Sequence, residues 1–217
     1  LDLTYLPERP GGQLLMWSRR RTVVVVPLSS TPEAARFPLL VAVPSAVKVF
    51  NWAATLYKGT IELTTPMLYA LAFMGLFTIG GLTGVFLGIM AVDRHLHDSY
   101  FVVAHFHYVV FGTVVFAMFA GFYFWWPKWT GKMLNERLGM IHFWLLFIGF
   151  HATFLVQHWL GVVGMPRRYA TYMEEDGFTW MNQLSTFGAF LLAASMIPFL
   201  LNVYITARRA PKVTVND

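Results

Sequence analysis

The sequence predicts an all-α protein, a polytopic bundle of about five transmembrane helices. Two observations predict this class. Apolar residues make up 57% of the 217 residues and charged residues only 12%, which leaves too few charges to cover a soluble globule. Four long stretches also contain no Asp, Glu, Lys or Arg, and a helix needs about 20 apolar residues to cross a bilayer. These stretches are residues 66–92, 99–126, 138–164 and 183–207.

A fifth stretch, residues 37–57, is apolar except for Lys48 and predicts the first helix of the bundle. Pro44 lies inside it and is expected to kink the backbone, because proline removes a helical hydrogen bond. None of the five stretches has the short apolar core and small-residue site of a cleavable signal. The chain begins with Leu1 rather than Met, and we expect it to be processed or to be a fragment.

The chain has three parts: the region of the five predicted helices and the segments before and after it. Residues 1–36 form an N-terminal leader that does not fit the pattern of membrane helices and is expected to be irregular, since Pro and Gly break it early. Within it, residues 18–21 are basic, and residues 23–26 favour a short strand or a buried run. Residues 37–207 form the membrane-embedded domain, and residues 208–217 form a tail.

Lysine and arginine are distributed unevenly over the two sides of the predicted bundle. With five spans, alternate connections fall on the same side. The positive-inside rule then predicts a cytoplasmic C-terminus for a protein of the cell's inner (plasma) membrane. The basic residues are topology signals, which excludes the nucleic-acid partner that a net charge of +5 first suggests. The C-terminal side carries Lys58, Lys128, Lys132, Arg137, Arg208, Arg209 and Lys212, and the other side carries Arg94, Arg167 and Arg168.

Histidine is the only soft metal ligand of note, because the chain contains no cysteine. His105 and His107 lie in the second uncharged stretch, and two residues along a helix turn by about 200°. Their imidazoles therefore point to nearly opposite faces and cannot easily share one metal. Intramembrane ionisable groups are functional by default, and neutral imidazole is the usual axial ligand of haem iron. The spacing predicts two cofactors flanking one helix; the alternative is two histidines hydrogen-bonded to neighbouring helices.

Two polar pairs lie in the loops on the outer side of the predicted bundle. His97 and Asp98 come just before the helix that carries His105, which lies about 9 Å below that helix end. Arg167 and Arg168 are adjacent, and guanidinium groups pair with carboxylates bidentately. These residues suit the carboxylates of a cofactor, and His97 with Asp98 suits a hard divalent ion. The alternatives are a solvated loop for the first pair and a topology signal for the second.

Lys48 is the twelfth residue of its 21-residue stretch, so it lies deep in the predicted membrane. A lysine at that depth more often marks a proton or ion route than a structural pair. Ser45 lies on nearly the same helix face and can extend a hydrogen-bonded chain. The alternative is a lysine that is neutralised or paired with an acid.

Other residues have structural interpretations. Gly80, Gly84 and Gly88 are spaced at four and predict close packing of their helix against a neighbour. Three further histidines, His142, His151 and His158, are expected to hydrogen-bond to neighbouring helices of the bundle.

Six short motifs occur along the chain: VPSAVKVFNW (43–52), TPM (65–67), GGLTG (80–84), HDSY (97–100), VAHFHY (103–108) and GMPRRY (164–169). Together they resemble the C-terminal half of haem–copper oxidase subunit I, in the style of a bacterial cytochrome c oxidase. The resemblance covers about residues 37–207. It implies a complete subunit of twelve transmembrane helices, of which this chain supplies the last five.

The resemblance implies a role for each motif residue. His105 resembles the proximal ligand of the high-spin haem and His107 an axial ligand of the low-spin haem, with Phe106 between the two haems. Arg167 and Arg168 resemble the pair that binds the haem propionates. The remaining residues carried over are His97 and Asp98, which resemble the pair near the outer magnesium site, and Lys48 with Ser45, which resemble the lysine proton pathway.

The same resemblance implies the cofactors and partners. The cofactors are two haems, expected to be a-type, together with copper and magnesium. The copper ligands and the second ligand of the low-spin haem belong to segments that this chain does not contain. The implied partners are subunit II with its copper, subunit III, cytochrome c as electron donor, O2 and the lipid bilayer.

The predicted function is therefore that of the catalytic subunit of a terminal respiratory oxidase. Such an enzyme reduces O2 to water in aerobic respiration and pumps protons, while this chain alone is expected to be inactive. Two alternatives stay open: a truncated, non-catalytic membrane fragment, and a quinol-oxidising member of the family, although Asp98 and Tyr108 favour the cytochrome c branch. A transporter with Lys48 in its pore would leave His105 and His107 unexplained.

Overall fold

The computed structural model describes residues 4–5, 13–17, 23–27 and 36–209. Its helices are α1 (Arg36–Leu56), α2 (Thr65–Gly88), α3 (Met90–Leu96), α4 (Tyr100–Val110), α5 (Phe116–Thr130), α6 (Glu136–Phe150), α7 (Val156–Val162) and α8 (Thr179–Arg209). Two π-helical segments, η1 (Phe111–Val115) and η2 (His151–Leu155), join α4 to α5 and α6 to α7, and a short 3₁₀ turn, η3 (Glu174–Asp176), precedes α8.

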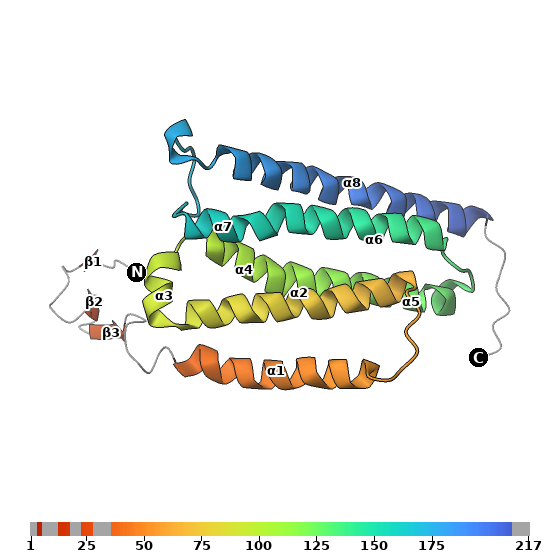
Figure 1. Cartoon of the computed structure of the whole chain (residues 1–217), viewed down its shortest axis with the longest axis horizontal. Helices are drawn as coiled ribbons and strands as arrows, with labels where there is room; N and C mark the ends of the chain where they lie inside the picture. The colour runs from red at the N-terminus through yellow and green to blue at the C-terminus, as the bar shows by residue number, and fades with distance from the viewer. Residues whose placement is uncertain (1–3, 6–12, 18–22, 28–35, 210–217) are drawn as a thin grey trace.

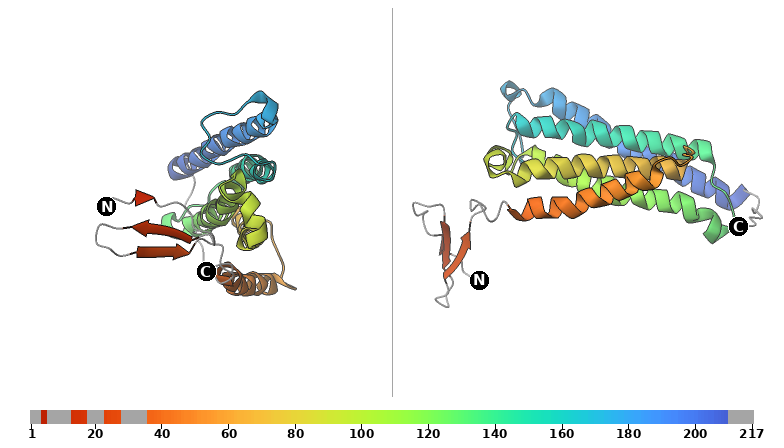
Figure 2. Two further views of the ribbon diagram at one scale, coloured as in Figure 1. Left: turned by 90° about the vertical axis from the view of Figure 1, so that its left-hand side faces the viewer. Right: turned by 60° about the horizontal axis from the view of Figure 1, so that its bottom comes forward.

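The structure confirms the all-α membrane class. Within the described residues, four helices are long and apolar enough to cross a membrane: α2, the continuous α4–η1–α5, the continuous α6–η2–α7, and α8. Helix α1 adds 21 residues, with Pro44 inside it. The long helices run side by side, with α8 along one edge and α1 along the opposite edge (Figure 1). Figure 2 shows the same order from two further sides.

Two expectations need correction. The stretch 66–92 is expected to be one helix, yet α2 ends at Gly88 and a separate helix, α3, runs from Met90 to Leu96. Asp93 lies in the first turn of α3, and Arg94 and His95 in the last, which suits the helix dipole. The leader is expected to be irregular, with a short strand or a buried run at residues 23–26. Three antiparallel strands are described in it: β1 (Thr4–Tyr5), β2 (Gln13–Trp17) and β3 (Val23–Pro27), of which β3 contains residues 23–26.

Aromatic side chains form the centre of the bundle. Tyr69, Tyr108, Phe116 and Phe150 are all fully buried. Phe116 and Phe150 lie 5.8 Å apart between ring centroids, edge to face, so α5 and α6 interlock. Many other large apolar side chains are exposed, as expected for helices whose surroundings are lipid or other membrane helices.

Small residues bring α2 and α4 close together, as the glycine spacing predicts. A Cβ added to Gly80 would lie 3.0 Å from the backbone nitrogen of Val109, and one added to Gly84 would meet the ring of His105. Because only hydrogen fits at these positions, the backbone of α2 lies directly against the helix that carries His105 and His107.

Candidate functional site

His105 is held against α2 by two polar contacts. Its Nδ1 lies 3.0 Å from the carbonyl oxygen of Gly80 and 3.2 Å from Oγ1 of Thr83. A carbonyl only accepts, so Nδ1 carries the proton and donates it to Gly80. Gly84 lies beside the ring atom between the two nitrogens, where an added Cβ would be 2.7 Å from Cε1. This cradle leaves Nε2 unprotonated, which is the form that binds a metal.

His107 has a different setting on the same helix. Its Nδ1 lies 2.8 Å from the carbonyl oxygen of Val103, one turn earlier, so its proton is also directed away from Nε2. The ring stacks on Phe154 of η2, with centroids 4.0 Å apart and an interplanar angle of 14°. His105 therefore packs on α2 while His107 packs on η2, as the two-residue spacing predicts. Phe106, between them in sequence, is 40% exposed.

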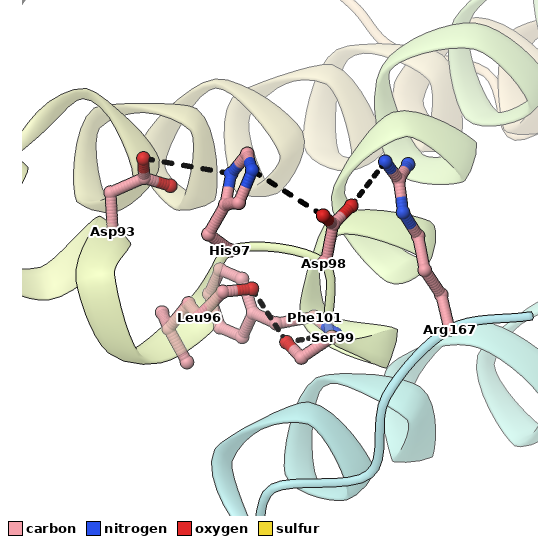
Figure 3. A network of polar contacts seen from close by, with 7 residues as sticks. All are labelled: Asp93, Leu96, His97, Asp98, Ser99, Phe101 and Arg167. Atoms are coloured by element: carbon pink, nitrogen blue, oxygen red, sulfur yellow. Dashed lines mark hydrogen bonds and ion pairs between the residues drawn. The ribbon is translucent and has the colours of Figure 1, made fainter. Parts of the chain in front are cut away.

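The loop residues predicted to lie on the outer side form one network with Asp93 of α3, shown in Figure 3. Asp98 accepts from the Nη2 of Arg167 and lies 3.5 Å from Nε2 of His97. His97 Nδ1 in turn lies 3.8 Å from the carboxylate of Asp93. A backbone hydrogen bond also joins Arg167 to Asp98, because the amide of Arg167 donates to the carbonyl of Asp98 at 2.8 Å. The structure thus brings Arg167 to His97 and Asp98, although 69 positions separate Asp98 from Arg167 in sequence.

One residue of this network and the neighbour of another have a left-handed backbone. Asp98 has φ of 56° and Arg168 has φ of 63°. Aspartate tolerates this region, but for arginine it is uncommon and marks local strain of the kind found at ligand-binding sites. Arg168 is exposed and pairs with no acidic side chain in the described part of the chain.

The arginines fit an anionic group. The Nε of Arg167 is buried and has no hydrogen-bond partner among the described residues. A buried donor without a partner is costly, so this guanidinium edge suits a carboxylate acceptor. The arginine donors would suit the two propionates of a haem, and the unprotonated Nε2 atoms of His105 and His107 would suit haem iron.

The fit to metal ions is weaker. Across the described residues, no group of three His, Asp or Glu side chains converges on a common position. His97 and Asp98 would give Mg²⁺ two of about six ligands, and the carboxylate of Asp98 already contacts Arg167 and His97. These two residues alone do not make a magnesium site, and we derive no chemistry from one.

Lys48 and Ser45 lie together on α1 but do not contact each other. The hydroxyl of Ser45 donates to the carbonyl of Val41 at 3.0 Å. The Nζ of Lys48 lies 5.7 Å from the ring centroid of Trp52, one turn further along. Trp52 in turn packs on Phe73 of α2, with centroids 4.9 Å apart. The amine is exposed on the surface of this chain, where another chain segment or water can reach it.

The histidines His142, His151 and His158 differ from one another in their contacts. His142 hydrogen-bonds across helices, as predicted: its Nδ1 lies 2.8 Å from Oη of Tyr69 and 3.1 Å from Oη of Tyr123. The prediction is wrong for His151, whose Nδ1 contacts the carbonyl of Phe147 in its own helix at 3.0 Å. It is also wrong for His158, which has no partner within the described residues.

One interhelical clamp was not predicted from the sequence. The side chain of Asn202 on α8 accepts from the amide of Asn135 at 2.9 Å and donates to its carbonyl at 2.8 Å. Asn202 is fully buried. An asparagine inside an otherwise apolar stretch is the sequence signal that would have found it.

Comparison with known proteins identifies close relatives. The family described as cytochrome c and quinol oxidase polypeptide I matches residues 26–191. A relative from Streptomyces avermitilis is 66% identical over 178 residues, which is 82% of this chain and 32% of that protein. The cytochrome c oxidase subunit 1 of Corynebacterium efficiens is 59% identical over 82% of this chain and 31% of that protein.

The fold has a solved counterpart. A chain in a cryo-EM structure of a heme-copper terminal oxidase dimer matches with a TM-score of 0.70 at 24% identity. The match covers 85% of this chain and 37% of the other, and at that identity it shows the fold alone. The chain thus spans about a third of the length of the curated relatives it matches.

Proposed function

Because this chain belongs to the cytochrome c and quinol oxidase polypeptide I family, we propose that it forms a haem-binding, C-terminal part of such a subunit. The complete subunit would be the catalytic oxidoreductase of a terminal respiratory oxidase, reducing O2 to water with electrons from cytochrome c and pumping protons as a translocase. One observation carries the proposal. His105 and His107 both direct Nδ1 at a backbone carbonyl and leave Nε2 for a metal, on different sides of one helix.

In this proposal His105 binds the iron of the high-spin haem and His107 that of the low-spin haem. The haems, expected to be a-type, and a copper ion would supply electron transfer and O2 binding. The chain's own residues position the imidazoles: Gly80 and Thr83 orient His105, and Val103 orients His107. Phe106 would lie between the two haems. The copper ligands would come from segments outside this chain.

The outer network is proposed to bind the cofactor's carboxylates. Arg167 has a buried Nε without a protein partner in the described residues, while its Nη2 is held by Asp98. Arg168 is exposed beside it. We propose that both arginines bind haem propionates and that Asp98 holds Arg167 in place. His97 and Asp98 would contribute to a magnesium site only with ligands from outside the described residues.

Lys48 and Ser45 are proposed to belong to a proton route. The amine of Lys48 lies at an exposed position of an apolar helix, where a charge is costly unless it meets water or a polar partner. The rest of the route would have to come from segments that cover α1 in the complete subunit, because Ser45 donates to its own helix rather than toward Lys48.

The four long apolar helices and the family indicate an integral membrane protein. We propose the inner (plasma) membrane, with residues 37–207 embedded and the tail from residue 208 in the cytoplasm. The proposed partners are subunit II with its copper, subunit III and cytochrome c.

The test uses the assembled complex purified from its native membranes with variants in this chain. His105→Ala should abolish the CO-binding spectrum of the high-spin haem and retain the low-spin spectrum, and His107→Ala should do the reverse. His95→Ala is the matched control, since His95 is an exposed histidine of α3. If neither variant changed either haem spectrum, the chain would be a non-catalytic membrane component. Comparing oxidation of reduced cytochrome c with that of quinol identifies the electron donor.

A further inference from the structure

Two polar side chains lie buried between α4 and α7, outside the residues assigned above. Tyr108 is fully buried and His158 is 7% exposed. Their ring centroids are 5.2 Å apart, with an interplanar angle of 63°. Phe101 closes one side of the imidazole, edge on, at 5.1 Å. The two rings thus pack against each other inside the interface of α4 and α7.

Neither side chain has a hydrogen-bond partner among the described residues. This holds for Oη of Tyr108 and for both ring nitrogens of His158. Buried polar groups are nearly always satisfied, and leaving one unpaired costs free energy.

The directions of donation are complementary. His107 and His151 both direct Nδ1 at the carbonyl four residues earlier. Phe154 stands in that position relative to His158. With the Nδ1-protonated tautomer of His107 and His151, Nε2 of His158 would accept a hydrogen bond, and the phenol of Tyr108 can donate one. A water molecule, which both accepts and donates, can join them.

We propose that a buried water bridges Tyr108 and His158 and makes both of them positioning residues for the haem-ligand helix. The outer ends of α4 and α7 are already joined, because Tyr100 N donates to the carbonyl of Met165 at 3.0 Å. Tyr108 lies eight residues deeper, about 12 Å along the helix axis. Two attachments at different depths prevent α4 from pivoting on α7. The consequence for haem geometry rests on the proposed function, whereas the water site itself does not.

The first test is a high-resolution cryo-EM map of the assembled complex. The expected result is a density peak within hydrogen-bond distance of Tyr108 Oη and a ring nitrogen of His158, absent in Tyr108→Phe. A direct hydrogen bond from Tyr108 to a protein atom, with no density between the two side chains, would overturn the proposal.

The second test is a double-mutant cycle followed by thermal unfolding. Tyr108→Phe and His158→Phe each leave a buried partner unpaired, so each should lower the melting temperature by roughly 3–6 °C. Combined, they remove both groups, and the loss should be smaller than the sum of the two single losses. Tyr204→Phe, the same atomic change at an exposed tyrosine of α8, should have no effect. Strictly additive losses would contradict a shared water.

The third test addresses positioning through the electron paramagnetic resonance spectrum of the low-spin haem. Tyr108→Phe and His158→Phe should shift its g values, and His158→Gln, which keeps an acceptor, should restore them. Unchanged g values would refute the positioning role. If the complex contained no haem, the proposed function would fail, yet the map and the double-mutant cycle would still decide whether the water is there.

Discussion

Replacing Gly84 by alanine tests whether His105 is held against α2. An added Cβ would lie 2.7 Å from Cε1 of His105, whereas ordinary contacts begin at about 3.4 Å. The imidazole or the helix must therefore yield by about 0.7 Å. Such a shift would carry Nδ1, now 3.0 Å from the carbonyl of Gly80, beyond hydrogen-bond range.

Two energetic effects of Gly84→Ala oppose each other. Losing the hydrogen bond costs about 0.5–1.5 kcal/mol. Alanine in place of glycine inside a helix gains about 1 kcal/mol. Overall stability should therefore change by less than about 1 kcal/mol, while the position of His105 changes. Because misplacement by about 1 Å can cost on the order of 100-fold in rate, O2 reduction should fall by roughly 10- to 100-fold.

The matched control is Gly81→Ala in the same helix, where an added Cβ meets nothing within 4 Å. It should raise the unfolding midpoint slightly and leave the CO-binding spectrum unchanged. The assay measures thermal unfolding, the CO-difference spectrum and O2 consumption for both variants. If Gly84→Ala matched Gly81→Ala in all three measurements, the inference that Gly84 and Gly80 position His105 would be wrong.

Three further changes probe other parts of the site. Asp98→Asn removes a negative charge beside Arg167 and should raise the midpoint potential of the low-spin haem. Its stability cost should stay below about 1 kcal/mol because the pair is partly exposed. An unchanged potential in a redox titration would count against the network. Gly161→Ala would place a Cβ against the backbone of Phe101. This overpacking should lower the free energy of unfolding by about 1–3 kcal/mol. An undiminished unfolding midpoint would show that α4 and α7 are not in close contact. Lys48→Met should leave the haem spectra intact and slow reduction of the oxygen site in stopped-flow experiments, and an unaltered rate would remove Lys48 from the proton route.

Length and apolar composition were enough to predict the membrane bundle. The uncharged stretch 99–126 corresponds to the continuous helix Tyr100–Thr130, and 138–164 to Glu136–Val162. Hydrocarbon leaves a chain segment few choices, since a helix satisfies every backbone group within the segment itself. The divergence of His105 and His107 was also predictable, because it depends only on helical periodicity. Their roles stay a prediction.

The partners of polar side chains were decided by tertiary structure. His142 and His151 look alike in sequence, yet one contacts Tyr69 on another helix and the other contacts its own backbone. Likewise, nothing in the sequence predicts that Asp98 pairs with Arg167, 69 positions later. Periodicity assigns a residue to a face of its own helix. Which neighbour that face meets depends on how side chains of separate helices interlock, and this packing exists only in the assembled bundle.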